Sequence, residues 1–124
     1  MKRFNPTIYP QRLWVAISKD GTDLNGLFRH QESNVIMLFE EYNFEDAEAV
    51  TLKVTEVKSR YSGVLIAFTH KNMKCSTIAH EAVHAAGFMF KSIGQQVNGD
   101  ETFAYLVGWI ADCCCKIVNG KAKQ

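Results

Sequence analysis

The sequence lacks three things: an excess of charge of one sign, a long apolar run, and cysteines spaced for pairing. Its 14 basic and 13 acidic side chains leave a net charge of +1, so the composition gives no sign of nucleic-acid binding. No stretch approaches the ~20 apolar residues of a membrane span. The basic start is not followed by an apolar run, so we expect no signal peptide. The sequence therefore predicts a cytoplasmic protein that binds neither nucleic acid nor membrane, and it indicates no oligomeric state.

The four cysteines do not form a metal-binding pattern. Cys113, Cys114 and Cys115 are consecutive, and on a helix they would point about 100° apart, so they cannot converge on one ion. We interpret them as small buried hydrophobic residues in a reducing compartment. Cys75 lies five residues before His80 and is the one thiol that the spacing leaves as an alternative ligand.

What the chain does contain is the pentapeptide His80-Glu81-Ala82-Val83-His84. On an α-helix, residues four apart lie one above the other, so both imidazoles can direct a ring nitrogen at the same metal ion. Glu81 would lie about 100° around the helix, where its carboxylate can contact a water on the metal without binding the metal itself. The pattern predicts a zinc-dependent hydrolase with its motif on a helix over residues 75–91.

The residues around the motif separate a metal face from a core face. The two histidines share a side of this helix with Gly87 and Lys91, and Gly87 leaves open space beside the metal. The opposite side carries the apolar spacing of a buried stripe. Its members are Ile78, Ala82, Ala85 and Met89.

A catalytic zinc usually takes three protein ligands and keeps one position for water, so a third ligand is required. Glu101 is the predicted one, near the start of a second helix that follows the turn at residues 95–99. One face of that helix would carry Glu101, Ala104, Tyr105, Gly108, Asp112 and Cys115. We expect Ala104 and Gly108 to let this face pack closely on the motif helix.

Two other acids compete with Glu101. Asp112 lies 11 residues further along the helix, about 16 Å away, so the two cannot serve one ion. In an antiparallel helix pair Asp112 would instead lie near the start of the motif helix. Asp100 is adjacent to Glu101 and points elsewhere.

The run His80-Glu81-x-x-His84, followed by Glu101 on a second helix, resembles the gluzincin branch of the zincin metallopeptidases. The segment from Glu101 to Tyr105 is also similar to small zincin-like proteins of bacteriophages and mobile elements. The resemblance covers residues 64–112, and the longer acidic signature of many gluzincin helices is missing. Phe90 stands where a metzincin would have its third histidine, which excludes that subclass.

The resemblance implies a zinc metallopeptidase that hydrolyses peptide bonds with a zinc-activated water. His80, His84 and Glu101 would hold Zn²⁺, and Glu81 would take the proton from the water and pass it to the leaving nitrogen. Tyr105 is the first candidate to stabilise the oxyanion and His70 the second. The alternative for Tyr105 is an aromatic side chain packed between the helices.

In zincins a peptide substrate commonly adds itself to an edge strand beside the metal. In this chain that strand could be the one at residues 64–68 or the one at residues 50–58. The alternative function is a non-catalytic, zinc-stabilised protein-interaction module of phage or mobile-element origin.

The fold is predicted to be α+β, with one domain over residues 1–124 and three or four strands before the two helices. Strands are expected over residues 12–18, 50–58 and 64–68, the last two joined by a turn at residues 61–63 as a hairpin. Residues 34–40 could be a strand or a short helix, and residues 41–49 a helical turn.

Overall fold

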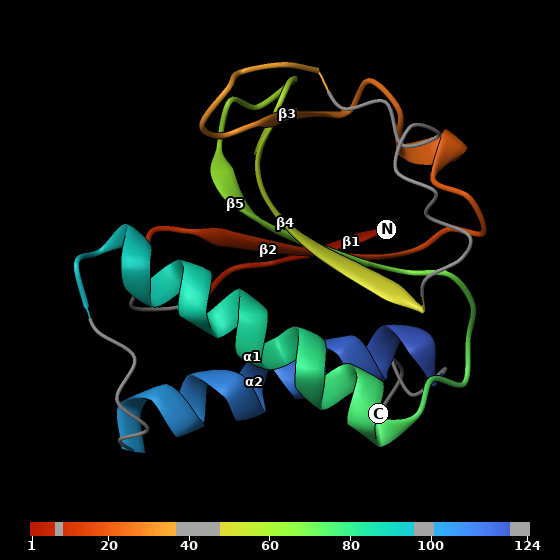
Figure 1. Cartoon of the computed structure of the whole chain (residues 1–124), viewed down its shortest axis with the longest axis vertical. Coiled ribbons are helices and arrows are strands. Elements are labelled where there is room, and N and C mark those ends of the chain that lie inside the picture. The colour runs from red at the N-terminus through yellow and green to blue at the C-terminus, as the bar shows by residue number, and fades with distance from the viewer. Residues whose placement is uncertain (7–8, 37–47, 96–100, 120–124) are drawn as a thin grey trace.

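A computed structural model describes residues 1–6, 9–36, 48–95 and 101–119. The elements are β1 (Lys2–Phe4), β2 (Arg12–Ile17), the 3-10 helix η1 (Thr22–Leu24), β3 (Phe28–His30), β4 (Ala49–Glu56), β5 (Ser62–Phe68), α1 (Cys75–Ser92) and α2 (Glu101–Val118). The α+β class is confirmed, with the strands first and two packed helices last (Figure 1). Neither described helix combines the length and the apolar character that crossing a bilayer requires.

The sheet has five strands in the order β1-β2-β5-β4-β3, where three or four had been predicted. The additional strands are β1 and β3, and each is only three residues long, too short to produce a recognisable alternation. β2 and β5 are parallel, and the other three pairs are antiparallel. The sheet is therefore mixed, with β5 in its centre.

The predicted hairpin of β4 and β5 is confirmed, but its turn lies earlier than expected. Residues 57–61 form the loop, and Arg60 takes a positive φ of 65°. Gly63 belongs to β5 and pairs with Arg12 of β2. A Cβ atom at Gly63 would lie 2.1 Å from the Arg12 carbonyl oxygen, so this glycine serves a close strand contact instead of the turn.

The sheet buries both faces of its central strands. On the helix side, Leu13 and Val15 of β2 and Ile66 of β5 pack against the buried faces of α1 and α2. On the other side, Trp14 and Leu65 pack against Phe28 in a second apolar cluster. Val50, Leu52 and Val54 of β4 belong to this second cluster, which leaves Thr51, Lys53 and Thr55 on the helix side as their alternation predicts.

Helix α1 follows the central strand after six connecting residues, so the motif is attached to the most buried part of the sheet. Its predicted core stripe is confirmed, since Ile78, Ala82, Ala85 and Met89 are all buried. The helix ends in a Schellman motif in which Gly94, at φ 77°, and Gln95 donate backbone hydrogen bonds to Lys91 and Phe90.

Helix α2 packs antiparallel to α1 beneath the sheet (Figure 1). The rings of Phe103 and Phe90 lie 5.1 Å apart at one end, and at the other end the Asn72 amide donates to the Val118 carbonyl. The buried side of α2 consists of Phe103, Leu106, Ile110, Cys113, Cys114 and Val118.

The face predicted to pack on α1 instead points to solvent. Ala104 and Gly108 are exposed, and a Cβ atom at Gly108 would meet nothing within 4 Å. The prediction that α2 packs closely on α1 through these two residues is therefore wrong. The bulky apolar residues of α2 take the contact because they bury more surface. Of the expectation for residues 34–40, the structure describes residues 34–36, where Ile36 forms an isolated bridge to Arg29, and most of the turn expected at residues 41–49 lies outside the described residues.

Candidate metal centre

His80 and His84 converge on the exposed side of α1. Their Nε2 atoms lie 3.1 Å apart. Two Zn–N bonds of 2.0–2.1 Å at a tetrahedral angle would separate the two nitrogens by about 3.3 Å. The helix thus holds the two imidazoles close to the spacing at which both can bind one ion, without a change of backbone. The predicted separation of metal face and core face is also present, because both histidines are exposed.

Glu81 points toward the sheet. Its side chain is buried, and its Oε1 accepts a hydrogen bond of 2.6 Å from the Thr51 hydroxyl of β4. That length is typical of a hydroxyl bonded to a carboxylate. Thr51 thereby fixes the carboxylate beside His80, which lines the same hollow.

Thr51 was not recognised in the sequence. The alternation of β4 placed it on the polar face of the strand but did not show that this face lies under the motif helix. The one available signal was a polar side chain at the middle of a half-buried strand, which is also typical of strands with no functional contact.

A hollow of about 360 Å³ opens at His80 and Glu81. Glu48, which precedes β4, lines it, and the Glu48 carboxylate accepts a hydrogen bond from Thr77 of α1. This bond lowers the pKa of Glu48 below its ordinary value, and the nearby charges of Lys74 and His70 act in the same direction. Glu48 is a second residue that sequence reasoning missed, and it places a negative charge at this end of the site.

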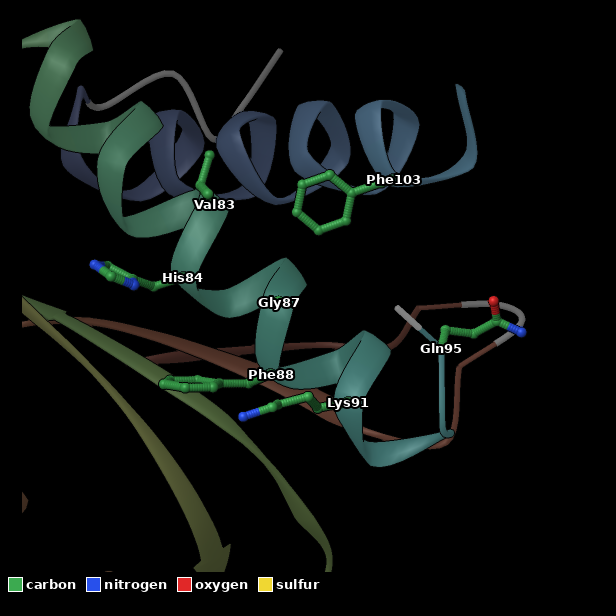
Figure 2. A pocket seen from close by; sticks show the side chains of 7 residues that line it. All are labelled: Val83, His84, Gly87, Phe88, Lys91, Gln95 and Phe103. Atoms are coloured by element: carbon green, nitrogen blue, oxygen red, sulfur yellow. The ribbon is translucent and has the colours of Figure 1, made fainter. Parts of the chain in front are cut away.

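A larger hollow of about 580 Å³ opens at His84, on the other side of the pair. Figure 2 shows Gly87 at its centre, with His84, Phe88 and Lys91 projecting to one side and Phe103 to the other. Phe88 also lines a third hollow of about 280 Å³ over β4, together with Thr51 and Lys53. The two histidines are therefore flanked by open space on both sides.

The edge strand beside the pair is β4. The strand at residues 64–68 is central, because β5 pairs with β2 and with β4. β3 pairs only with residues 54–56 of β4, and within the described residues no strand covers the outer edge of residues 49–52. Of the two strands that the sequence left open, only β4 has, among the described residues, an uncovered edge near the motif.

Glu101 is the first residue of α2, and its side chain is exposed. Because Phe103 packs on Phe90, six residues beyond His84, Glu101 lies at least about 9 Å from His84 along the axis of α1. Across residues 1–6, 9–36, 48–95 and 101–119, no three histidine, cysteine or acidic side chains gather as a metal site. The structure thus brings His80 and His84 together and places Glu81 in the hollow beside His80, and Glu101 as third ligand stays a prediction.

The other predicted participants lie outside this cluster. Tyr105 is 75% exposed on the solvent side of α2, so the alternative of an aromatic packed between the helices is wrong. His70 is exposed after β5, with its Nδ1 in a hydrogen bond of 3.0 Å with the Thr69 hydroxyl. Asp112 lies toward the end of α2 that adjoins the start of α1, as an antiparallel pair requires.

Two of the three consecutive cysteines have the buried environment that the sequence predicted, and Cys115 is only partly buried. Cys113 and Cys114 are buried, and burial raises the pKa of Cys113 to about 11 and that of Cys114 still further. Cys75 is exposed, and among the described residues it joins no metal-binding group with the histidines.

Comparisons of the chain with family models, with curated proteins and with solved structures each returned no match.

Proposed function

We propose that this protein is a zinc-dependent metallopeptidase of the gluzincin type. The observation that carries the proposal is the convergence of the two imidazoles, whose Nε2 atoms lie 3.1 Å apart, beside a buried and anchored carboxylate. A histidine pair on a helix can bind zinc for purely structural reasons. A structural site has no use for a carboxylate next to the metal, so Glu81 favours catalysis.

The residues divide the chemistry between them. His80 and His84 would hold Zn²⁺, which supplies a Lewis acid that polarises a carbonyl group and acidifies water. Glu81 accepts the proton of the attacking water and returns it to the nitrogen of the broken amide bond. Thr51 keeps the carboxylate in place while the carboxylate gains and loses its proton. The Thr51 hydroxyl donates to Oε1 and leaves Oε2 to carry the proton.

The substrate would lie along β4. The edge of residues 49–52, which no described strand covers, offers backbone hydrogen bonds to an extended peptide, a mode of binding that accepts varied sequences. The hollows at Glu48 and at Lys53 lie at the two ends of this edge, and the histidines lie between them on α1. A peptide bound there would cross the site between His80 and the sheet.

Glu101 remains the proposed third ligand, and it has to move to reach the pair. It begins α2, and the terminal turns of helices open at little cost in free energy. Unwinding one turn frees about three residues, or roughly 10 Å of extended chain, which matches the axial gap. Zinc binding can contribute about 10 kcal/mol in folded sites, far more than one helical turn costs.

The test is zinc content and peptide hydrolysis, measured side by side on the native chain and matched variants. Glu81→Gln should keep its zinc and lose about 10²–10⁴-fold in rate. His84→Ala should lose both zinc and activity. Glu101→Gln should lower zinc affinity, while Asp112→Asn, on the same exposed face of α2, should not. A native chain that binds zinc but cleaves no member of a broad peptide library would overturn the proposal.

One observation favours the alternative, a non-catalytic zinc-stabilised interaction module. Only two metal-binding side chains converge in the described part of the chain, and two ligands are fewer than catalytic zinc sites use. The same experiment separates the two functions. In an interaction module, Glu81→Gln would leave every measured property of the native chain unchanged except stability.

A further inference from the structure

The hollow at His84 has a floor without a side chain. Gly87 lies in the middle of α1, where glycine costs about 1 kcal/mol relative to alanine. Gly87 lines the hollow without contributing a side chain, and Figure 2 places it on α1 between His84 and Lys91. The sequence thus carries a helix-destabilising residue at a position that lines the hollow.

The walls of this hollow are mainly apolar. Val83, Phe88 and Phe103 supply them, and Val83 is 48% exposed although it is a large aliphatic residue. The volume of about 580 Å³ falls in the range of pockets that bind small molecules and large side chains. An aromatic or long aliphatic side chain would cover this exposed apolar surface.

One lysine, Lys91, lies on the rim of the hollow. Lys91 lies two helical turns beyond His84, and within the described residues it enters no ion pair. Lys53 lies over the Phe88 ring, with its Nζ 5.5 Å from the ring centre, and it is paired to Glu32. The acids nearest the motif, Glu48 and Glu81, line the hollow on the opposite side of the histidines. A ligand reaching past Gly87 therefore meets the ammonium group of Lys91, while Lys53 and Glu32 beside it offset each other's charge.

We infer that this hollow selects the substrate: it takes a large apolar side chain from a peptide that carries a carboxylate two residues further along. Gly87 and Lys91 are four residues apart, about 6 Å along the helix. Side chains on the same side of an extended peptide are about 6.6–7 Å apart, so the two contacts fit residues i and i+2. The inference rests on the proposed function and names its substrate class.

The experiment uses the full chain with Glu81→Gln and zinc, so that binding is measured without turnover. The probes are fluorescent blocked hexapeptides with Phe-Ala-Glu at their centre, and the same peptides with Ala-Ala-Glu or Phe-Ala-Lys. Both chain directions are included, since an extended peptide can lie either way along β4. Binding should weaken about tenfold or more without the aromatic ring, and about fivefold with the reversed charge.

Variants of the hollow provide the second arm. Gly87→Leu should fill the floor and abolish the preference for the aromatic ring, while its higher helix propensity keeps the melting temperature unchanged or raises it. Lys91→Glu should reverse the preference between the acidic and basic peptides. Lys58→Glu, in the hairpin loop, is the matched control and should change neither preference.

The outcomes separate this inference from the proposed function. Equal binding of all peptides, or preferences that survive both Gly87→Leu and Lys91→Glu, would overturn the inference even if the native chain hydrolyses peptides. Selective binding with no hydrolysis by the native chain would support the hollow as a binding site and overturn the enzyme.

Discussion

The hydrogen bond from Thr51 to Glu81 is the contact whose removal has the most direct consequence. It joins β4 to α1, it is 2.6 Å long, and the acceptor is a carboxylate that is only 8% exposed. Replacing Thr51 by valine keeps the shape and the strand preference of the side chain and removes only the hydroxyl. The change therefore isolates this one bond.

Leaving a buried carboxylate without its partner costs about 1.5–3 kcal/mol. For a chain of 124 residues, this corresponds to a fall in Tm of about 6–11 °C. Thr51→Ser, which keeps the hydroxyl, should cost far less. In a Glu81→Gln background the acceptor is neutral, so the effect of Thr51→Val should shrink to about 1 kcal/mol.

Urea unfolding of the four chains of this double-mutant cycle measures the coupling between the two side chains. Thr55→Val is the matched control, because Thr55 lies on the same face of β4 and its hydroxyl bonds the neutral Ser62 hydroxyl at 2.9 Å. The control should cost about 0.5–1 kcal/mol. The reasoning is refuted if Thr51→Val costs no more than the control, or if its cost is the same with and without the carboxylate.

Three further outcomes follow from the packing. Gly63→Ala should destabilise the chain by about 1–3 kcal/mol, because its Cβ would collide with the Arg12 backbone. Gly108→Ala, in open space on α2, should stabilise the chain by up to about 1 kcal/mol. Thermal unfolding measures whether each substitution lowers or raises the stability. Iodoacetamide at pH 8 should modify the exposed Cys75 well before the buried Cys113, as peptide mass spectrometry can follow, and equal rates would contradict the described burial. Burial raises the pKa of Cys113 from 9.0 to about 11, so the thiol loses its proton at a lower pH in the unfolded chain than in the folded one. The free energy of unfolding should therefore fall as the pH rises from 9 to 11. Cys113→Ala should make this dependence of the free energy on pH less steep.

The sequence predicted the parts of the fold that repeat with a clear period. The helix bearing His80 and His84 and the hairpin of β4 and β5 each show their apolar spacing over many residues, and both are present. β1 and β3 were not predicted, because a strand of three residues contains no measurable alternation of apolar and polar side chains. The parallel pairing of β2 with β5 depends on contacts between distant segments, which local spacing does not encode.

The site was predictable to the same extent. Helical spacing is sufficient to bring two imidazoles together, so the histidine pair could be foreseen from residues 80–84 alone. The partner of Glu81 could not, because Thr51 reaches it only through the docking of α1 on the sheet. For α2, spacing placed Glu101 and Tyr105 on one face, but small and apolar residues occur all around this helix, and its larger side chains determine which face is buried.

The parallel pairing of β2 with β5 has a consequence for synthesis of the chain. Ile17 pairs with Phe68, so 51 more residues must be synthesised after β2 before the β5 strand that it pairs with is complete. At a translation rate of about 5–20 residues per second, this interval lasts about 3–10 s. Throughout it Leu13 and Trp14, both buried in the finished sheet, remain uncovered on a nascent chain, where a chaperone can bind them.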